Sequence, residues 1–592
     1  MTISHSTEAT MKNLQKISER NKLLFLSLAV GLASGLVAVV LERLISLIQK
    51  GLAPIIAGSS AFHWSYVLLP GVGMLLSFLL VKYVVKDNIG HGVTKVLLSV
   101  SRNESRIKPH NMWSSVITSS LTIGFGGSVG AEAPIVYTGA AIGSNVGQKF
   151  NLSHRGVTIL VGCGAAGAIA GIFQAPLAGV LFTLEILLFN ISMTSMMPLL
   201  LSTVTATVVS SLLIGDSMTF KCTVEAFSMS RIPFYLILGI MCGMVSLYFT
   251  RSTLYLEDRI SRFGNPWIKW ICCAMGLGLL IMLFPPLFGE GYSTVRALLN
   301  VAEDKLSSQQ PFLLTIFDSP WDIPIFFTLV MLLKVVSMTL TNAGGGIGGT
   351  FGPTLVVGAL AGFVVVRSLN LLNCQLPEQN FVLVGMAGLM AGVMQAPMTA
   401  IFLIAEITGG YELLLPLIIC STVSFGTTRI WEKYSIYTKR IAQSGDLLTH
   451  DSAQAVLTLM DTDSLIKNTY ARVYSNDSLG KLVKTISEST GSVIAVVDRK
   501  GRFQGMINIS DARKHLFNTE EYGKLKAYNL MTDVPEYIYV GEKMDVVMDK
   551  FESTDAWRLP VVNSEHQYMG FISRSRILAA YREKLKEISP ED

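Results

Sequence analysis

The sequence predicts a mainly α-helical, polytopic membrane protein that ends in a smaller α/β module. Of the 592 residues, 50% are hydrophobic and 15% are charged, and the mean hydropathy is +0.49. Because soluble domains carry about 25% charged residues, most of the chain is expected to face lipid or a very large apolar core. Two further observations support this fold class: the apolar part repeats itself, and charged residues return only from about Ser444.

Apolar segments follow one another from Leu24 to about Trp431. Several are shorter than the ~20 residues that a straight membrane-spanning helix needs, and glycine and proline interrupt them. Irregular backbone survives in lipid only where protein or a water-filled cavity covers it, so tilted, broken or half-crossing helices are expected. The segments begin near Leu24, Tyr66, Trp113, Val157, Leu177, Pro198, Ile232, Trp267, Ile323, Pro353, Phe381, Met398 and Leu413.

Charge and cysteine content restrict the location and the partners. Basic residues precede the first apolar segment, and no signal peptide is evident. By the positive-inside rule, the N-terminus is expected in the cytoplasm and the protein in the cell membrane, crossing it several times. The net charge of +5 is too small to indicate a nucleic-acid partner. The seven cysteines are scattered without a CxxC pair, which predicts neither a disulfide framework nor a metal site.

The membrane part contains an internal repeat. The stretch "FQAPLAGVLFTLEI" (173–186) matches "MQAPMTAIFLIAEI" (394–407), with Glu185 and Glu406 at the same distance after Gln-Ala-Pro. Upstream, "GAEAP" resembles "GTFGP", and the two offsets are 221 and 219 residues. An odd number of apolar segments, seven, separates the copies, so the halves are expected to be inverted in the membrane. Inverted repeats with broken helices are a transporter architecture, with the site near the midplane.

Three glycine-rich stretches, which begin at Gly90, Gly126 and Gly344, run into apolar helices. Glycine permits close backbone approach, and free N–H groups at a helix N-terminus bind anions without a buried cation. These glycines could instead serve only close helix packing. Three such helix starts in one membrane domain, two of them in duplicated positions, favour a dehydrated anion site.

Glu132 is the one charge in the apolar stretch from Trp113 to Val146. A carboxylate in a membrane costs roughly 2.5 to 3.5 kcal/mol, so it is expected to have a function. Next to helix N-termini, the charged carboxylate would compete with a permeating anion and the protonated form would leave, which makes a proton-sensitive gate. The alternative is a structural glutamate bonded to a neighbouring helix, and this role is expected for Glu185 and Glu406.

These motifs resemble the CLC family of chloride channels and proton/chloride exchangers over residues 24–440. The family's G-[KR]-E-G-P motif corresponds to residues 130–134 and its G-x-F-x-P motif is intact at 349–353. The resemblance implies a homodimer with one pore per subunit, for chloride or similar monovalent anions, with Glu132 as the gate. The implied anion contacts are His91, Gly92, Ala133, Thr350, Phe351 and Tyr437, whose hydroxyl would donate to the ion.

Three departures from the family pattern bear on mechanism. His91 replaces a serine of the G-S-G-I-P motif, so its imidazole either contacts the ion or turns away and leaves the backbone to bind. Ala131 removes the basic residue beside the gate. Ile186 stands where exchangers typically carry an internal proton glutamate. An isoleucine cannot carry a proton, which favours a channel-like pathway; a proton-coupled antiporter, fed by water chains or another acid, remains the alternative.

The C-terminal part repeats "VVDRKGRFQG" as "VVNSEHQYMG" and resembles a pair of CBS domains. The expected division is a cytoplasmic segment 1–23, a membrane domain 24–440, a linker 441–462, and cytoplasmic CBS domains 463–518 and 519–590. CBS pairs often bind adenine nucleotides through Gly-x-x-[ST]-x-x-Asp, which Asn508, Asp511 and Ser573 match in part, with Arg576 at the second aspartate position. No cofactor is required, and a dimerisation and stability module is the alternative.

Two other classes of function are considered. A membrane receptor would use the C-terminal pair to sense nucleotide near Asp511 and would conduct no ions. A membrane enzyme would use Ser128, because "GGSVG" fits a hydrolase G-x-S-x-G motif, and "GCGAAG" fits a dinucleotide-binding G-x-G-x-x-G motif. The hydrolase would still need a histidine and an acid beside Ser128, which the sequence alone cannot supply. The dinucleotide motif has Glu185 near the required distance but lies in membrane helix and not in an α/β unit. We therefore expect a transport protein and no enzyme.

Overall fold

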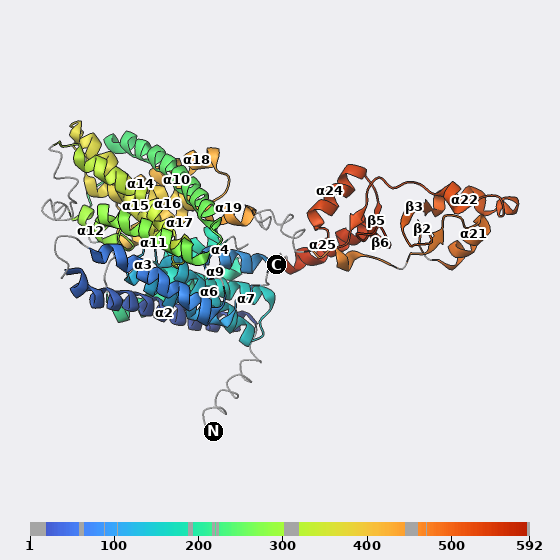
Figure 1. Cartoon of the computed structure of the whole chain (residues 1–592), viewed down its shortest axis with the longest axis horizontal. Coiled ribbons are helices and arrows are strands. Elements are labelled where there is room, and N and C mark those ends of the chain that lie inside the picture. The colour runs from blue at the N-terminus through green and yellow to red at the C-terminus, as the bar shows by residue number, and fades with distance from the viewer. Residues whose placement is uncertain are drawn as a thin grey trace, which may run out of the picture. The chain divides into compact units, whose positions relative to one another are not determined.

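The computed structural model describes residues 19–57, 64–87, 89–102, 105–187, 193–215, 220, 224–300, 319–443, 460–468, 470–489 and 491–588. The chain divides into two compact units, Met1–Leu447 and Leu448–Asp592, which are described one at a time (Figure 1). Most of the expected segment 1–23 and most of the expected linker 441–462 lie outside the described residues.

The first unit is helical. Its first half contains α2 (Glu19–Ala57), α3 (Trp64–Leu79), the π-helix η1 (Leu80–Val85), α4 (Gly92–Arg102), the short 3-10 helix η2 (Pro109–Met112), α5 (Ser114–Gly124), α6 (Glu132–Lys149), α7 (His154–Phe173), α8 (Pro176–Ile186) and α9 (Met193–Ile214). Its second half contains α10 (Ile232–Ser261), α11 (Pro266–Leu283), α12 (Tyr292–Leu299), α14 (Asp322–Ala343), α15 (Phe351–Leu371), α16 (Glu378–Met394), α17 (Pro397–Ile407), α18 (Leu414–Trp431) and α19 (Ile436–Gln443).

Among the described residues, nine helices are long and apolar enough to cross a membrane, and α4, α8, α16 and α17 are shorter apolar helices. The predicted polytopic helical fold with short helices is therefore confirmed. Each predicted segment begins within a few residues of a helix, but the apolar stretch 113–146 is divided into α5 and α6. The division has a backbone cause, because Gly126 in the intervening loop adopts a φ of 98°, which ends a right-handed helix.

The repeat is visible in how the helices pack. Helix α6 packs on α7 and α15 packs on α16, and Figure 1 shows the earlier helices (blue to cyan) and the later ones (green to yellow) gathered on different sides of this unit. A methyl group on Gly139 or Gly164 would overlap the carbonyl of the other glycine. Gly358 and Gly385 make the same mutual contact in the second half. The repeat therefore preserves a glycine-to-glycine helix crossing that no larger residue fits.

The second unit is an α/β module, as predicted. One three-stranded sheet has the order β1 (Arg472–Tyr474), β2 (Val493–Val497), β3 (Phe503–Asn508), and the other has β4 (Ile538–Tyr539), β5 (Arg558–Val562), β6 (Tyr568–Ser573). In each, the first pair is parallel and the second antiparallel. The helices are α21 (Leu479–Glu488), α22 (Ile509–Leu516), α23 (Ala527–Leu530), α24 (Met544–Thr554) and α25 (Arg574–Ile588).

The repeated Val-Val to Gly spacing has a structural explanation. Val496 pairs with Gly505 across the β2–β3 hairpin, and Val561 pairs with Gly570 across β5–β6. A methyl group on Gly570 would lie 2.6 Å from the carbonyl oxygen of Lys467, which pairs with the adjacent strand residue. The glycine is needed because a further backbone segment approaches the hairpin at this point.

Candidate functional site

The glycine-rich loops before α6 and α15 are joined by their backbones. The amide of Gly130 donates to the carbonyl of Gly349 at 3.1 Å, and the amide of Gly349 donates to the carbonyl of Gly130 at 2.7 Å. The start of α4 lies against the same place, because a methyl group on Gly92 would overlap the carbonyl of Ala133. The three glycine-rich helix starts that the sequence singles out therefore meet at one point, near Ala133.

Glu132 is the first residue of α6, and its side chain is only 1% exposed. Its Oε2 accepts a hydrogen bond of 3.1 Å from the amide of Gly352, the second residue of α15. That amide has no partner within its own helix, and the positive end of the helix dipole favours an anion there. The Oε1 atom accepts a bond of 2.6 Å from the hydroxyl of Tyr292. The carboxylate thus sits where the N-terminus of α15 would hold an anion.

Tyr437 lies at the same helix start. Its hydroxyl oxygen accepts a hydrogen bond of 3.2 Å from the hydroxyl of Thr350, which is the residue immediately before α15. The side chain is 3% exposed, and its own O–H faces the weak sulfur acceptor of Met394 at 4.0 Å. Phe351 is fully buried and packs against Phe173, with ring centres 5.5 Å apart. The structure therefore brings Thr350, Phe351 and Tyr437 together beside Glu132.

His91 is the residue immediately before α4. Its backbone has a left-handed φ of 56°, and Nε2 is 3.8 Å from Oε1 of Glu257. That carboxylate also accepts bonds from Arg440, the closer one at 2.6 Å. His91 and Glu257 line a cavity of about 510 Å³ together with the glycine-rich loop 344–348. The imidazole thus lies next to the Glu257–Arg440 ion pair and at the edge of this cavity.

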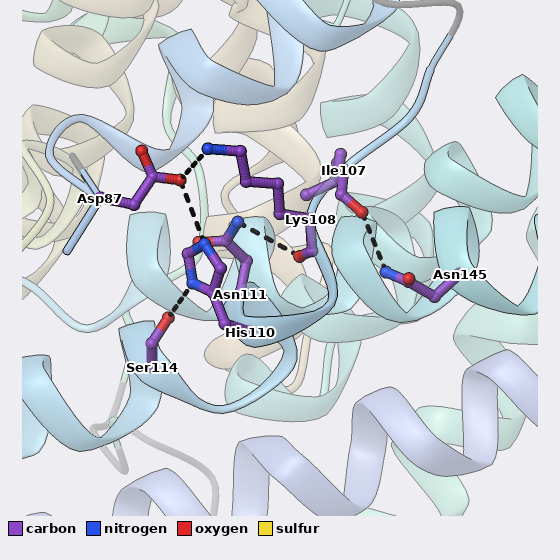
Figure 2. Close-up of polar contacts among 7 residues, drawn as sticks. All are labelled: Asp87, Ile107, Lys108, His110, Asn111, Ser114 and Asn145. Carbon is purple, nitrogen blue, oxygen red and sulfur yellow. Dashed lines mark hydrogen bonds and ion pairs between the residues drawn. The ribbon is translucent and has the colours of Figure 1, made fainter. Parts of the chain in front are cut away.

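A polar cluster supports the loop that leads to His91. Asp87, just after η1, contacts Nζ of Lys108 at 2.8 Å and Nε2 of His110 at 3.1 Å, as Figure 2 shows. The carbonyl of neighbouring Ile107 accepts a bond of 3.1 Å from Asn145 of α6 (Figure 2). The segment between α4 and α5 therefore ties the loop before α4 to the helix that begins with Glu132.

Glu185 and Glu406 cap each other's helices. Glu185, near the end of α8, accepts from the amides of Met398 and Thr399 at the start of α17, at 2.9 and 2.6 Å. Glu406, near the end of α17, accepts from the amides of Leu177 and Ala178 at the start of α8. The two helices are therefore antiparallel, as an inverted repeat requires. Next to Glu185, Ile186 is 4% exposed.

Three polar residues near Glu132 were not predicted from the sequence. Tyr292 contacts Glu132 directly, and Oε1 of Glu290 accepts a bond of 3.2 Å from the amide of Ala131. Lys334 of α14 is fully buried and donates to the hydroxyl of Ser128 at 2.8 Å. A lone charge in an apolar run identifies Glu132, and the same signal could have identified Lys334. No local signal identifies Tyr292, because its contact joins residues far apart in the chain.

The contact between Ser128 and Lys334 bears on the hydrolase hypothesis. A serine next to a lysine is a known nucleophile and base arrangement. Both side chains are 0% exposed, however, and the hydroxyl lies inside packed helices. A carbonyl substrate has no access to it, so the pair is better explained as part of the polar network around Glu132.

The residues predicted for nucleotide binding lie at the ends of β3 and β6. Asp511, in the first turn of α22, is exposed and accepts a bond of 3.1 Å from Asn508. In the second module, the Ser573 hydroxyl is 3.2 Å from that of Ser575. Arg576 lies in the first turn of α25, at the position that corresponds to Asp511. The two modules therefore offer different chemistry at equivalent places.

Comparisons with known proteins agree with this geometry. Residues 72–429 match the family model described as voltage gated chloride channel, and residues 458–518 and 527–583 match that of the CBS domain. The chain is 29% identical over 379 residues to chloride channel protein CLC-e of Arabidopsis thaliana, which covers 60% of this chain and 50% of that protein. It is 27% identical to the H(+)/Cl(-) exchange transporter ClcA of Salmonella schwarzengrund, covering 69% of this chain and 86% of that protein.

Two solved structures share the fold. A slow cyanobacterial Cl−/H+ antiporter has a TM-score of 0.62 and 25% identity, over 72% of this chain and 99% of that chain. A eukaryotic CLC transporter has a TM-score of 0.60 and 16% identity, over 94% of this chain and 97% of that chain, which shows the fold alone. With the family model matched over residues 72–429, the chain belongs to the voltage gated chloride channel (CLC) family, and it carries a pair of CBS domains after its membrane unit.

Proposed function

We propose that the protein transports chloride or a similar monovalent anion through the membrane, along a path that Glu132 opens and closes according to its protonation. The observation that carries this proposal is the position of the Glu132 carboxylate on the free amide of Gly352. A carboxylate held there blocks the place where a permeating anion would bind. Protonation removes its charge and with it most of the attraction to the helix N-terminus.

The proposed anion contacts are the backbone at Gly92, Ala133, Thr350 and Phe351, together with the hydroxyl of Tyr437. His91 contributes its backbone, because its ring is directed at Glu257. These groups bind an anion through N–H and O–H dipoles, with no fixed cation in direct contact. Such a site can release its ion, because the attraction is weaker than that of a full positive charge.

The structure of α8 favours a passive, channel-like path. Ile186 is buried and carries no proton, and its neighbour Glu185 is held by two amides and the Thr399 hydroxyl of α17. Proton-coupled antiport is the alternative, and it is favoured by the ClcA relative and the cyanobacterial structure, which are named as exchangers. Glu257 beside His91 is an acid that could supply protons in that case.

We also propose a homodimer, with the N-terminus and the CBS pair in the cytoplasm. Helices α8 and α17 have 11 residues each, too short to cross a bilayer, and Leu177 and Met398 at their starts are partly exposed. Backbone ends within a membrane must be covered by protein rather than lipid. A second subunit on this face would provide that cover.

The test is transport by the purified full-length protein in chloride-loaded liposomes, with chloride efflux and external pH recorded together. In Glu132→Gln the side chain is permanently uncharged, so flux should be high and should lose most of its dependence on pH. An unchanged pH profile in this variant would remove Glu132 from the gate. Chloride efflux without proton movement would indicate a channel, whereas proton uptake driven by chloride would establish antiport.

The same recording separates the other class of function. A nucleotide-sensing receptor would carry neither ion, in the wild type or in Glu132→Gln, at any pH. That result would contradict the transport proposal and leave the CBS pair as the functional part.

A further inference from the structure

Lys334 is a buried cation within 22 residues of apolar helix α14. Its ammonium donates to the hydroxyl of Ser128 at 2.8 Å and to the carbonyl of Gly289 at 2.7 Å. Ser128 lies in the loop that ends at Glu132, and the amide of Gly289 donates to the carbonyl of Gly126 in the same loop at 3.0 Å. Keeping a cation in a membrane interior is costly, so the residue calls for a functional explanation.

The segment 289–292 connects this cation to the gate. Gly289 accepts from Lys334, Glu290 accepts from the amide of Ala131, and Tyr292 donates to Glu132. The turn between them depends on Gly291, which has a left-handed φ of 97°, and a methyl group there would lie 3.0 Å from a methyl group of Val356. The four residues 289–292 thus connect two acidic groups, Glu132 and Glu290, with the basic group of Lys334.

The charge of Glu290 acts on both Glu132 and Lys334, and so links the acidic group at the start of α6 with the basic group of α14. Two neighbouring carboxylates oppose each other's ionisation, whereas a nearby ammonium favours the ionised form of both. The other groups around them are Glu42 of α2, Arg296 and Tyr292 of α12, and Tyr437 of α19. Ala131 contributes no charge beside Glu132, and Lys334 of α14 is the one lysine or arginine among the described residues that is buried.

We propose that Glu290 and Lys334 are positioning residues that set the pH at which Glu132 releases the amide of Gly352. Lys334 stabilises the charged, bound form of the gate, and Glu290 opposes it. This inference rests on the proposed gating role of Glu132. It predicts opposite effects for the two residues, which a merely structural role would not produce.

The experiment measures chloride efflux against pH in liposomes for wild type, Glu290→Gln, Lys334→Met and the double variant. Glu290→Gln removes the opposing charge but keeps an oxygen for the Ala131 amide, so the midpoint should move to lower pH. Lys334→Met removes the stabilising charge, so the midpoint should move to higher pH. Each shift should be about one pH unit, the order of magnitude of a single charge–charge interaction in protein, and the double variant should lie between them.

Controls separate this effect from general damage. Thr328→Val removes a hydroxyl that donates to Pro324 elsewhere on α14, and its midpoint should match wild type. Adding Ala131→Lys to Lys334→Met restores a cation beside the gate and should return the midpoint toward wild type. If Lys334→Met does not fold, the midpoint of Glu290→Gln by itself tests the proposal. A midpoint in Glu290→Gln that is unchanged or moves to higher pH overturns the proposal. If instead the gating role of Glu132 is wrong, chloride efflux in Glu132→Gln will keep its dependence on pH.

Discussion

Tyr292 donates the shorter of the two hydrogen bonds that hold Glu132, at 2.6 Å against 3.1 Å from the Gly352 amide. Both bonds favour the charged carboxylate, and a bond to a charged group contributes about 1.5–3 kcal/mol. Tyr292→Phe should therefore free the gate and increase chloride efflux at neutral pH by roughly tenfold or more. The measurement is the initial efflux rate in liposomes at constant protein density.

Tyr248→Phe is the matched control, because it removes a tyrosine hydroxyl that donates to the Leu332 carbonyl at 3.0 Å, away from the gate. Its efflux should equal that of wild type. Equal rates in both variants would mean that the Tyr292 hydroxyl does not restrain Glu132.

At the scale of single residues, the sequence could predict only those that stand out from their neighbours in the chain, such as a charge in an apolar run or a member of a motif. Glu132 is conspicuous because a lone carboxylate in apolar sequence needs a partner, and Thr350 and Phe351 follow from an intact motif. Lys334 carries the same signal in α14 and was missed, because no repeat or motif marks it. Tyr292 contacts Glu132 across 160 residues of sequence, and only the fold reveals such a contact.

At the scale of elements, α8 and α17 are held together because a glutamate near the end of each accepts hydrogen bonds from the free amides at the start of the other. Glu185 satisfies two free amides and the Thr399 hydroxyl at the start of α17. Glu185→Ala removes these bonds, so the free energy of unfolding should fall by about 1–2 kcal/mol. The measurement is thermal or denaturant unfolding of the protein in detergent, followed by the flux assay.

Glu185→Gln retains an acceptor oxygen and should lose less stability, which separates the hydrogen bonds from the charge. The flux of both variants should keep the wild-type midpoint in pH. A shifted midpoint with unchanged stability would instead place Glu185 on a proton pathway.

The predicted order of helices was right because apolar length and proline at helix starts are local properties. Helix α12 was not predicted, since its eight residues have no span-length apolar run. It carries Tyr292 to Glu132, so the element missed by the hydropathy pattern contributes a direct contact to the proposed gate.

For the whole molecule, the repeat was the strongest sequence signal, because the two offsets agree within two residues. The same offsets relate the glycine pair Gly139 and Gly164 to Gly358 and Gly385, which pack identically in the two halves. The sequence could predict that two halves exist, but it could not show that Gly130 and Gly349 bond to each other. That contact depends on the folding of both halves together.

The CBS pair leads to a prediction for the full-length protein. The two modules share a fold, but only the first has an acidic group at the position where ribose hydroxyls would bind, Asp511, against Arg576 in the second. We therefore expect at most one adenine nucleotide per chain. Asp511→Ala should weaken binding by roughly tenfold to a hundredfold, because hydrogen bonds to a charged group are lost.

Equilibrium binding of labelled ATP to the purified full-length chain measures this directly. Asp498→Ala provides the control, since that partly buried aspartate accepts from the amides of Lys500 and Arg502 in the β2–β3 turn, away from Asp511. Its affinity for ATP should match wild type, and two nucleotides per chain would contradict the assignment to Asp511. Absence of binding by the wild type at millimolar ATP would favour the other explanation, in which the pair stabilises the dimer.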